Sequence, residues 1–248
     1  TGSLLTGVCF AKGMSLGLKI PLIPINHLEA HICANFLENP ALTYPFICLL
    51  VSGGHTQLWR IIEQDKYHLL GETRDDAAGE ALDKGARILG LGYPGGPAIE
   101  KCAVGGNSKA IEFPRALLGK NNLEFSFSGL KTALLYYMRN LDESENNHNM
   151  NDIAASYQSA VVDVLITKLK NALELTAINT CVIAGGVSAN KILRESAIIH
   201  LAPAKVHFPS LPLCTDNAAM VAYLGELKLT AGENSSLSFP VLPNLSLT

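Results

Sequence analysis

The sequence carries little charge of either sign. Charged residues make up 17% of its 248 residues, and the formal net charge is -3 at pH 7. A slightly acidic chain has no global attraction for nucleic acid, so any contact with RNA would depend on a local basic patch or on partner subunits. Composition alone therefore suggests no nucleic-acid substrate.

Closely spaced cysteines and long apolar runs are also missing. The cysteines are Cys9, Cys33, Cys48, Cys102, Cys181 and Cys214. None forms the two-residue spacing of a zinc knuckle or redox pair, so we expect reduced, mostly buried thiols. No segment approaches roughly eighteen uninterrupted apolar residues, and no basic run precedes an apolar one near the first residue. We therefore expect a cytoplasmic protein with no membrane contact.

What the chain does have is a large apolar fraction, 48% of its residues, which suffices for a sizeable core in one large or two modest domains. Strand-like apolar runs alternate with stretches of helical periodicity, and this alternation is typical of an α/β fold. Strands are expected at 46–52, 56–62, 67–71, 181–184 and near 206, and helices at 4–18, 27–38, 77–91, from 98, at 153–175, from 190, and at 215–229. The polar tract 142–152 is the clearest linker or exposed loop.

Two histidines stand one helical turn apart in a predicted helix. Asn26 precedes His27 and is followed three residues later by Glu29, a pattern of helix N-termini. On a helix, His27 and His31 project from one face and could share one metal ion. The glutamate that zinc peptidases carry directly after the first histidine is missing. Such pairs are more often ordinary surface or core residues, so a metal site needs a third ligand.

Asp216 is a candidate for that third ligand, because it lies where the last helix is expected to open and its carboxylate would be held in a defined direction. The alternative is that Thr215 or Asp216 merely caps the helix, and residue types alone favour this second interpretation.

Two glycine-containing turns could hold a phosphate. Residues 51–56 read Val-Ser-Gly-Gly-His-Thr, and glycine lacks the β-carbon that would keep an anion from the backbone amides. Residues 184–190 read Ala-Gly-Gly-Val-Ser-Ala-Asn, between a buried strand and a helix N-terminus that favours anions. Neither matches the P-loop or the dinucleotide fingerprint, so an ordinary kinase or Rossmann oxidoreductase is not supported. Ordinary turn chemistry is the alternative for each.

Asp83, Glu100 and the Gly95-Gly96 pair are weaker candidates for site residues. By residue type alone, Asp83 is a solvated charge on a helix surface, and the glycines belong to a helix-breaking loop that could line a pocket.

Four motifs, in this order, resemble those of one family. They are Asn-His-Leu-Glu-Ala-His at 26–31, Leu-Val-Ser-Gly-Gly-His-Thr at 50–56, Phe-Ser-Phe-Ser-Gly-Leu-Lys-Thr at 125–132 and Gly-Gly-Val-Ser-Ala-Asn at 185–190. Together they are similar to the tRNA threonylcarbamoyladenosine transferases, the TsaD family, in its bacterial and organellar branch. The resemblance covers essentially the whole chain.

The resemblance implies an α/β fold of the actin, sugar-kinase and Hsp70 superfamily, with two lobes that close over a nucleotide. It implies transfer of threonylcarbamoyl from threonylcarbamoyl-AMP to the N6 amine of the adenosine beside the anticodon, in tRNAs that read codons beginning with A. It also implies one divalent ion, iron (Fe2+) or zinc, on His27, His31 and Asp216. The substrate cleft would involve Leu50, Val51, Ser52, Gly53, Gly54, Asp83, Gly96, Glu100 and Asn190. Expected partners are tRNA, a paralogous TsaB-type subunit and a TsaE-type ATPase.

The chain departs from the family at its first residues. Members begin with a strand pair that carries a Ser-Cys-Asp-Glu-Thr-like phosphate loop, whereas Thr1 to Leu4 look like the tail of the Gly-Pro-Gly segment that follows it. We therefore expect an incomplete first lobe at residues 1–40 and a second lobe at 41–248.

Two other functions stay open at this point. A metal-dependent peptidase could use the histidine pair, and a non-catalytic module could bind nucleotide without transferring anything. If tRNA is bound, its phosphates should meet a basic patch such as Lys84, Arg87, Lys131 and Arg139.

Overall fold

The computed structural model describes residues 2–141, 149–233, 235–243 and 245–247. Its centre is a five-stranded mixed sheet in the order β3-β2-β1-β4-β5. The antiparallel part consists of β1 (Phe46–Val51), β2 (Thr56–Glu63) and β3 (Lys66–Glu72). On the other side of β1, the strands β4 (Thr180–Ala184) and β5 (Lys205–His207) pair in parallel. The expected α/β fold is confirmed.

Both faces of this sheet are covered, which explains why β1 is apolar without alternation. All six residues of β1 are buried. Side chains along a strand alternate between its faces, so Ile47, Leu49 and Val51 belong to one hydrophobic cluster. Phe46, Cys48 and Leu50 belong to another.

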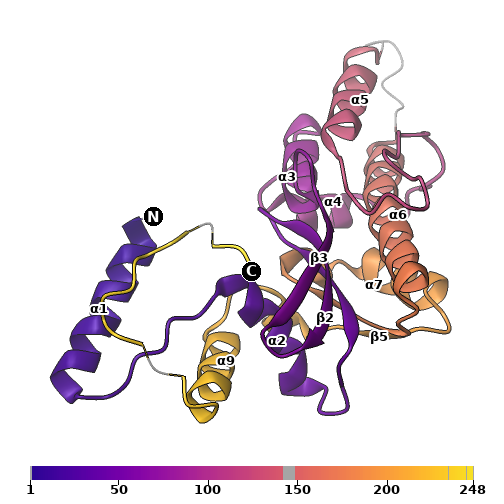
Figure 1. Cartoon of the computed structure of the whole chain (residues 1–248). Helices are drawn as coiled ribbons and strands as arrows, with labels where there is room; N and C mark the ends of the chain where they lie inside the picture. The colour runs from indigo at the N-terminus through magenta and orange to yellow at the C-terminus, as the bar shows by residue number, and fades with distance from the viewer. Residues whose placement is uncertain (1, 142–148, 234, 244, 248) are drawn as a thin grey trace.

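The first face packs against a group of helices that Figure 1 shows gathered on one side of the molecule. They are α3 (Ala78–Ile88), α4 (Gly95–Cys102), α5 (Ser128–Arg139), α6 (Met150–Thr176) and α7 (Lys191–His200). The longest, α6, is buried over much of its surface because it lies between the sheet and the other helices. A helix in that position is apolar on more than one face.

The second face is covered by α2 (His27–Glu38), whose Leu28 and Ile32 join the cluster on that face. Behind α2 lies α9 (Ala218–Thr230). The small side chains of Ala30, Cys33 and Ala34 pack there against Met220 and Leu224. Small residues let two helices approach closely, so this contact places the start of α9 beside the start of α2.

The first helix, α1 (Gly2–Leu18), stands apart from the sheet, and Figure 1 shows the C-terminal segment running along it. Lys12 Nζ donates to the carbonyl oxygen of Phe239 at 2.7 Å and lies over the ring of the same residue. Ser15 is the buried residue of this helix. Among the described residues, no helix combines the length and the apolar character needed to cross a bilayer.

The expected elements differ from the structure mainly at helix ends. The helix expected from residue 98 begins at Gly95, and the last helix begins at Ala218 rather than 215. The short helix α8 (Leu211–Cys214) and α5 were not expected. Residues 142–148 of the expected linker lie outside the described residues, and 150–152 belong to α6.

The cysteines are all free, as expected, and four of them are buried: Cys33, Cys48, Cys181 and Cys214. Burial raises the pKa of Cys33 and of Cys181 to about 12, which leaves both as unreactive core thiols.

Candidate functional site

The two histidines lie at the beginning of α2, where a side chain fixes the helix start. Asn26 accepts hydrogen bonds from the backbone N–H groups of Leu28 and Glu29. One turn apart on one face, the rings of His27 and His31 meet edge to face with their centroids 4.7 Å apart. Glu29 points elsewhere: its carboxylate accepts from Tyr67 Oη at 2.9 Å and pairs with Lys228. It therefore plays no part in a capping box.

Asp216 reaches the same place from the far end of the sequence. It follows α8 and precedes α9, and its side chain is 81% exposed. Its Oδ1 lies 3.2 Å from His27 Nε2 and 3.2 Å from His31 Nε2. The interpretation of Thr215 or Asp216 as the helix cap is wrong, because Asn217 caps α9 by accepting from the backbone N–H of Met220.

These three side chains suit a divalent metal ion. Their ligand atoms all lie within 4.8 Å of one another. Two atoms that each bind an ion at about 2.1 Å stand about 3 Å apart, which is the separation seen between the carboxylate and each imidazole. Burial, followed by coulombic repulsion from His27, lowers the pKa of His31 despite its contact with Asp216. A lowered pKa favours the neutral ring, which is the form that binds a metal ion.

The first glycine turn lies beside this cluster. The backbone N–H of Ser52 donates to the carbonyl oxygen of His55, and the N–H of His55 donates to Ser52 Oγ, which closes the turn after β1. The charge of His27 contributes to the lowered pKa of His55, after burial. A β-carbon added at Gly53 or Gly54 would meet only open space, so both face a region that a ligand can enter.

The second glycine turn follows β4, the parallel neighbour of β1, so the two strands end at the same edge of the sheet. Gly185 has φ of +89° and packs so closely on β1 that an added β-carbon would lie 2.4 Å from the carbonyl oxygen of Val51. The turn continues as a short 3-10 helix, Gly186–Ala189, and leads to Asn190, which caps α7. The two glycine turns therefore converge in space.

Asp83 on α3 contacts Gly95 at the start of α4. Asp83 Oδ1 accepts from the backbone N–H of Gly95 at 2.7 Å. An added β-carbon at Gly95 would lie 2.4 Å from the Cα of Asp83, so the helices touch there through backbone. Asp83 is therefore not the freely solvated charge that its residue type suggested. A β-carbon added at Gly96 would meet only the side chain of Leu82, at 3.9 Å.

Glu100 on α4 meets the second glycine turn. Its two carboxylate oxygens accept from Asn190 Nδ2 at 3.0 Å and from the backbone N–H of Lys191 at 3.2 Å. Asn190 also approaches the buried side chain of Gln158 on α6 at 3.5 Å. No sequence pattern singles out Gln158, which lies in the middle of an otherwise ordinary core helix.

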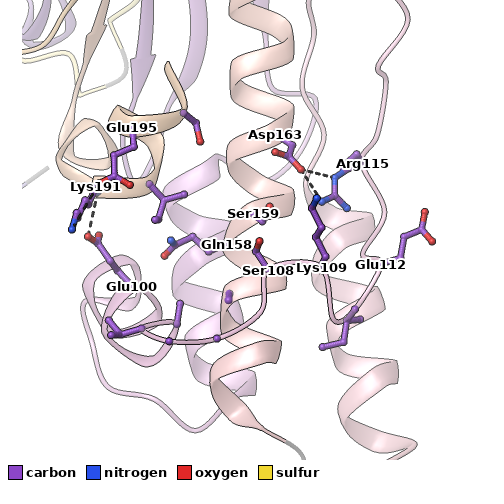
Figure 2. A pocket seen from close by; sticks show the side chains of 18 of the residues that line it. Glu100, Ser108, Lys109, Glu112, Arg115, Gln158, Ser159, Asp163, Lys191 and Glu195 are labelled. Atoms are coloured by element: carbon purple, nitrogen blue, oxygen red, sulfur yellow. Dashed lines mark hydrogen bonds and ion pairs between the residues drawn. The ribbon is translucent and has the colours of Figure 1, made fainter. Parts of the chain in front are cut away.

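A cavity of about 940 Å³ opens beside Glu100. Figure 2 shows Glu100, Lys191 and Glu195 on one side of it and Arg115, paired with Asp163, on the other. Its apolar lining near Glu100 includes Ala103, Val104 and Ile192. Polar and charged side chains thus lie on both sides of the cavity, and an apolar part adjoins Glu100. A concave site that combines apolar surface with placed polar groups can bind a small molecule.

Two of the four basic residues expected to form a patch are engaged with acidic partners. Lys84 Nζ lies 2.7 Å from Asp76 and 2.8 Å from Glu80, and Lys131 lies 3.9 Å from Asp76. Arg87 and Arg139 are exposed on α3 and α5.

Comparisons with known proteins bear on the family to which this chain belongs. The family model described as "TsaD: tRNA N6-adenosine threonylcarbamoyltransferase" matches residues 1–223. The tRNA N6-adenosine threonylcarbamoyltransferase of Thermosipho melanesiensis is 52% identical over 99% of this chain and 74% of its own length. That of Desulfitobacterium hafniense is 50% identical over 99% of this chain and 73% of its own length.

A solved structure of HypF from T. kodakarensis superimposes with a TM-score of 0.68, at 15% identity, over 90% of this chain and 39% of that one. At that identity the likeness shows the fold alone, and it agrees with the expected α/β fold. The match to the family model and the identity to its members decide the relationship. This chain belongs to the tRNA N6-adenosine threonylcarbamoyltransferase family.

Proposed function

We propose that this chain provides the metal and nucleotide sites of a transferase that moves threonylcarbamoyl from threonylcarbamoyl-AMP to the N6 amine of adenosine in tRNA. The observation that carries the proposal is the position of the His27, His31 and Asp216 cluster beside two convergent glycine turns. The family, matched over residues 1–223, supplies the chemistry.

We propose one orientation for the adenylate in the cleft. Glu100 and Asn190 would contact the ribose, and the adenine would enter the cavity over Ala103 and Val104. The phosphate would then face the open side of the turn at Gly53 and Gly54, between the ribose and the histidines. Leu50, Val51, Ser52, Asp83 and Gly96 would complete the lining.

His27, His31 and Asp216 would hold one divalent ion, iron or zinc. When bound, such an ion polarises a phosphate or carbamoyl oxygen and stabilises the charge that develops on it. The reaction joins the N6 nitrogen to the carbamoyl carbon and breaks the bond from that carbon to the phosphate oxygen. The amine loses a proton, and AMP leaves. The glycine turns hold the phosphate through backbone amides and so orient the carbamoyl carbon.

The orientation of Glu29 argues against the peptidase interpretation. A metallopeptidase of the two-histidine type needs a carboxylate next to the metal as general base. Glu29 is buried, and Tyr67 and Lys228 hold its carboxylate away from the histidines. The non-catalytic module stays as an outcome of the test.

The proposal also includes tRNA and two partner proteins. Because the chain is slightly acidic, we propose that tRNA meets Arg87 and Arg139, with Lys84 and Lys131 nearby, and that a TsaB-type subunit and a TsaE-type ATPase assist in the cytoplasm. We also propose that residues 1–40 and 41–248 belong to different lobes.

The test combines the chain and both partner subunits with threonylcarbamoyl-AMP, made with labelled threonine, and a tRNA that reads codons beginning with A. We expect label on the adenosine beside the anticodon, and loss of labelling in Asp216→Asn. Binding of AMP without any transfer would favour the non-catalytic module, and metal-dependent cleavage of a peptide would favour the peptidase.

A further inference from the structure

Arg194 on α7 touches two parts of the site that are far apart in the sequence. Its Nε donates to the carbonyl oxygen of Ser188 at 2.7 Å. Its Nη2 donates to the carbonyl oxygen of Pro209 at 2.6 Å and to Cys214 Sγ at 3.1 Å. The guanidinium carbon lies 4.8 Å from the centre of the Phe208 ring, which supports it from the side.

The first of these contacts belongs to the nucleotide side. Ser188 is a fully buried residue of the 3-10 helix between Gly185 and Asn190. A nucleotide that contacts Asn190 therefore binds two residues away from the carbonyl oxygen that Arg194 holds. Asn190 also caps the helix from which Arg194 projects, because its Oδ1 accepts from the N–H of Leu193.

The other contacts belong to the metal side. Cys214 is fully buried and stands two residues before Asp216, in the last turn of α8. The start of α8 is tied to α2, since Glu38 accepts from the backbone N–H of Ser210 at 2.7 Å. Asp216 itself is exposed, so its position depends on how the segment before it is held.

We propose that Arg194 is a positioning residue that couples the nucleotide turn to Asp216, so that nucleotide and metal each strengthen the binding of the other. The proposal rests on the function proposed above. The guanidinium is a rigid fork, and one group of this kind cannot keep its contacts to Ser188 and Cys214 unless both segments stay in place. A nucleotide that orders the Ser188 turn thereby orders the segment that presents Asp216. Thermodynamic linkage requires the effect to be equal in both directions.

The test measures Zn2+ affinity with and without saturating AMP, and AMP affinity with and without Zn2+. For the unaltered chain we expect each to tighten the other by the same factor, about fivefold or more. In Arg194→Lys, which keeps the charge but not the fork, the factor should fall below about twofold. Arg74→Lys is the matched control, because the Arg74 side chain pairs with Glu124 rather than with Ser188 or Cys214, so this variant should keep the full factor.

A second variant covers the case in which Arg194→Lys does not fold. Cys214→Ala removes one contact at the metal end and leaves the contact to Ser188 intact, so it should reduce the coupling factor while AMP alone binds as before. Thermal unfolding of each variant shows whether the measurements refer to folded protein.

The outcomes separate this proposal from the one on which it rests. If Zn2+ and AMP both bind the unaltered chain but independently, the coupling is wrong and the proposed function stands. Equal coupling in Arg194→Lys and the unaltered chain would likewise overturn the role of Arg194. If Zn2+ or AMP fails to bind the unaltered chain, the proposed site falls and the coupling falls with it.

Discussion

The cluster of His27, His31 and Asp216 lies beside the two glycine turns, yet the cluster and the turns are held in different ways. His31 and Asp216 are 185 residues apart, and they meet because α9 packs on α2. The nucleotide turns follow adjacent parallel strands, and Gly185 contacts the backbone of Val51 directly. The carboxylate of Asp216 is exposed, whereas Gly185 is packed against the backbone of β1. A substitution at Asp216 should therefore change metal affinity, and a substitution at Gly185 should change stability.

The largest effect is expected for Gly185→Ala. The new methyl group would meet the carbonyl oxygen of Val51 at a φ that alanine rarely adopts. We expect the free energy of unfolding to fall by about 3 kcal/mol, measured by urea denaturation. Gly186→Ala is the control, because its β-carbon enters open space and its φ is ordinary, and it should change stability by less than about 1 kcal/mol. Equal losses in both variants would show that the contact with Val51 has no special weight.

Asp216→Asn, by contrast, should lower metal affinity and leave stability nearly unchanged. We expect Zn2+ affinity to fall about 100-fold, equivalent to about 2.7 kcal/mol, because a carboxylate ligand is replaced by a weaker one. The free energy of unfolding should change by less than about 0.5 kcal/mol, since the side chain is exposed. Calorimetric titration and denaturation give the two values. Glu226→Gln, on the exposed side of α9, should leave both unchanged. A large loss of stability in Asp216→Asn would erase the contrast between the two regions.

Glu100→Gln should weaken AMP binding about tenfold, or about 1.4 kcal/mol, because Asn190 and Lys191 lose hydrogen bonds to a charged acceptor. Fluorescence competition or calorimetry measures this loss. Glu195→Gln provides the comparison, because that side chain lines the same cavity but is exposed and faces Lys191 at 3.8 Å. If the two variants weaken AMP equally, the carboxylate of Glu100 has no specific role in the cleft.

How much of this could be read from the sequence differs between the two regions. The strands and turns were predicted closely, because short apolar runs and glycine pairs are local signals. The histidine spacing was visible as well, but Asp216 was not distinguishable from a helix cap by residue type. Its link to the histidines is a tertiary contact, and the resemblance to a family, rather than periodicity, brought it forward.

The errors have physical causes too. The start of α9 was misplaced because Thr215, Asp216 and Asn217 are all good capping residues, and the structure uses the third. Residue type alone makes Asp83 a solvated charge, because nothing local shows that it accepts from Gly95. The contacts of Arg194 join segments that the sequence keeps apart, so no pattern could have revealed them.

The smallest expected effect concerns Asp75, which lies in the body of the fold, away from the metal. Burial raises the pKa of Asp75, but hydrogen bonds from Ser126, Phe127 and Ser128 outweigh it and hold the pKa below its usual value. The carboxylate should therefore add about 1 kcal/mol of stability at neutral pH, reduced by solvent screening. That contribution disappears as pH falls through the lowered pKa.

Unfolding of the unaltered chain and of Asp75→Asn, compared between pH 7 and pH 3, measures this contribution. The difference in stability should shrink toward acid pH. If it stays constant, the bonds of Asp75 do not depend on its charge.

The most direct test of the account is the anomalous scattering of crystals grown with Zn2+ or Fe2+. We predict one ion, at about 2.0–2.2 Å from a ring nitrogen of His27, a ring nitrogen of His31 and a carboxylate oxygen of Asp216. An ion bound by other residues, or no ion at this cluster in a chain that transfers threonylcarbamoyl, would contradict the account.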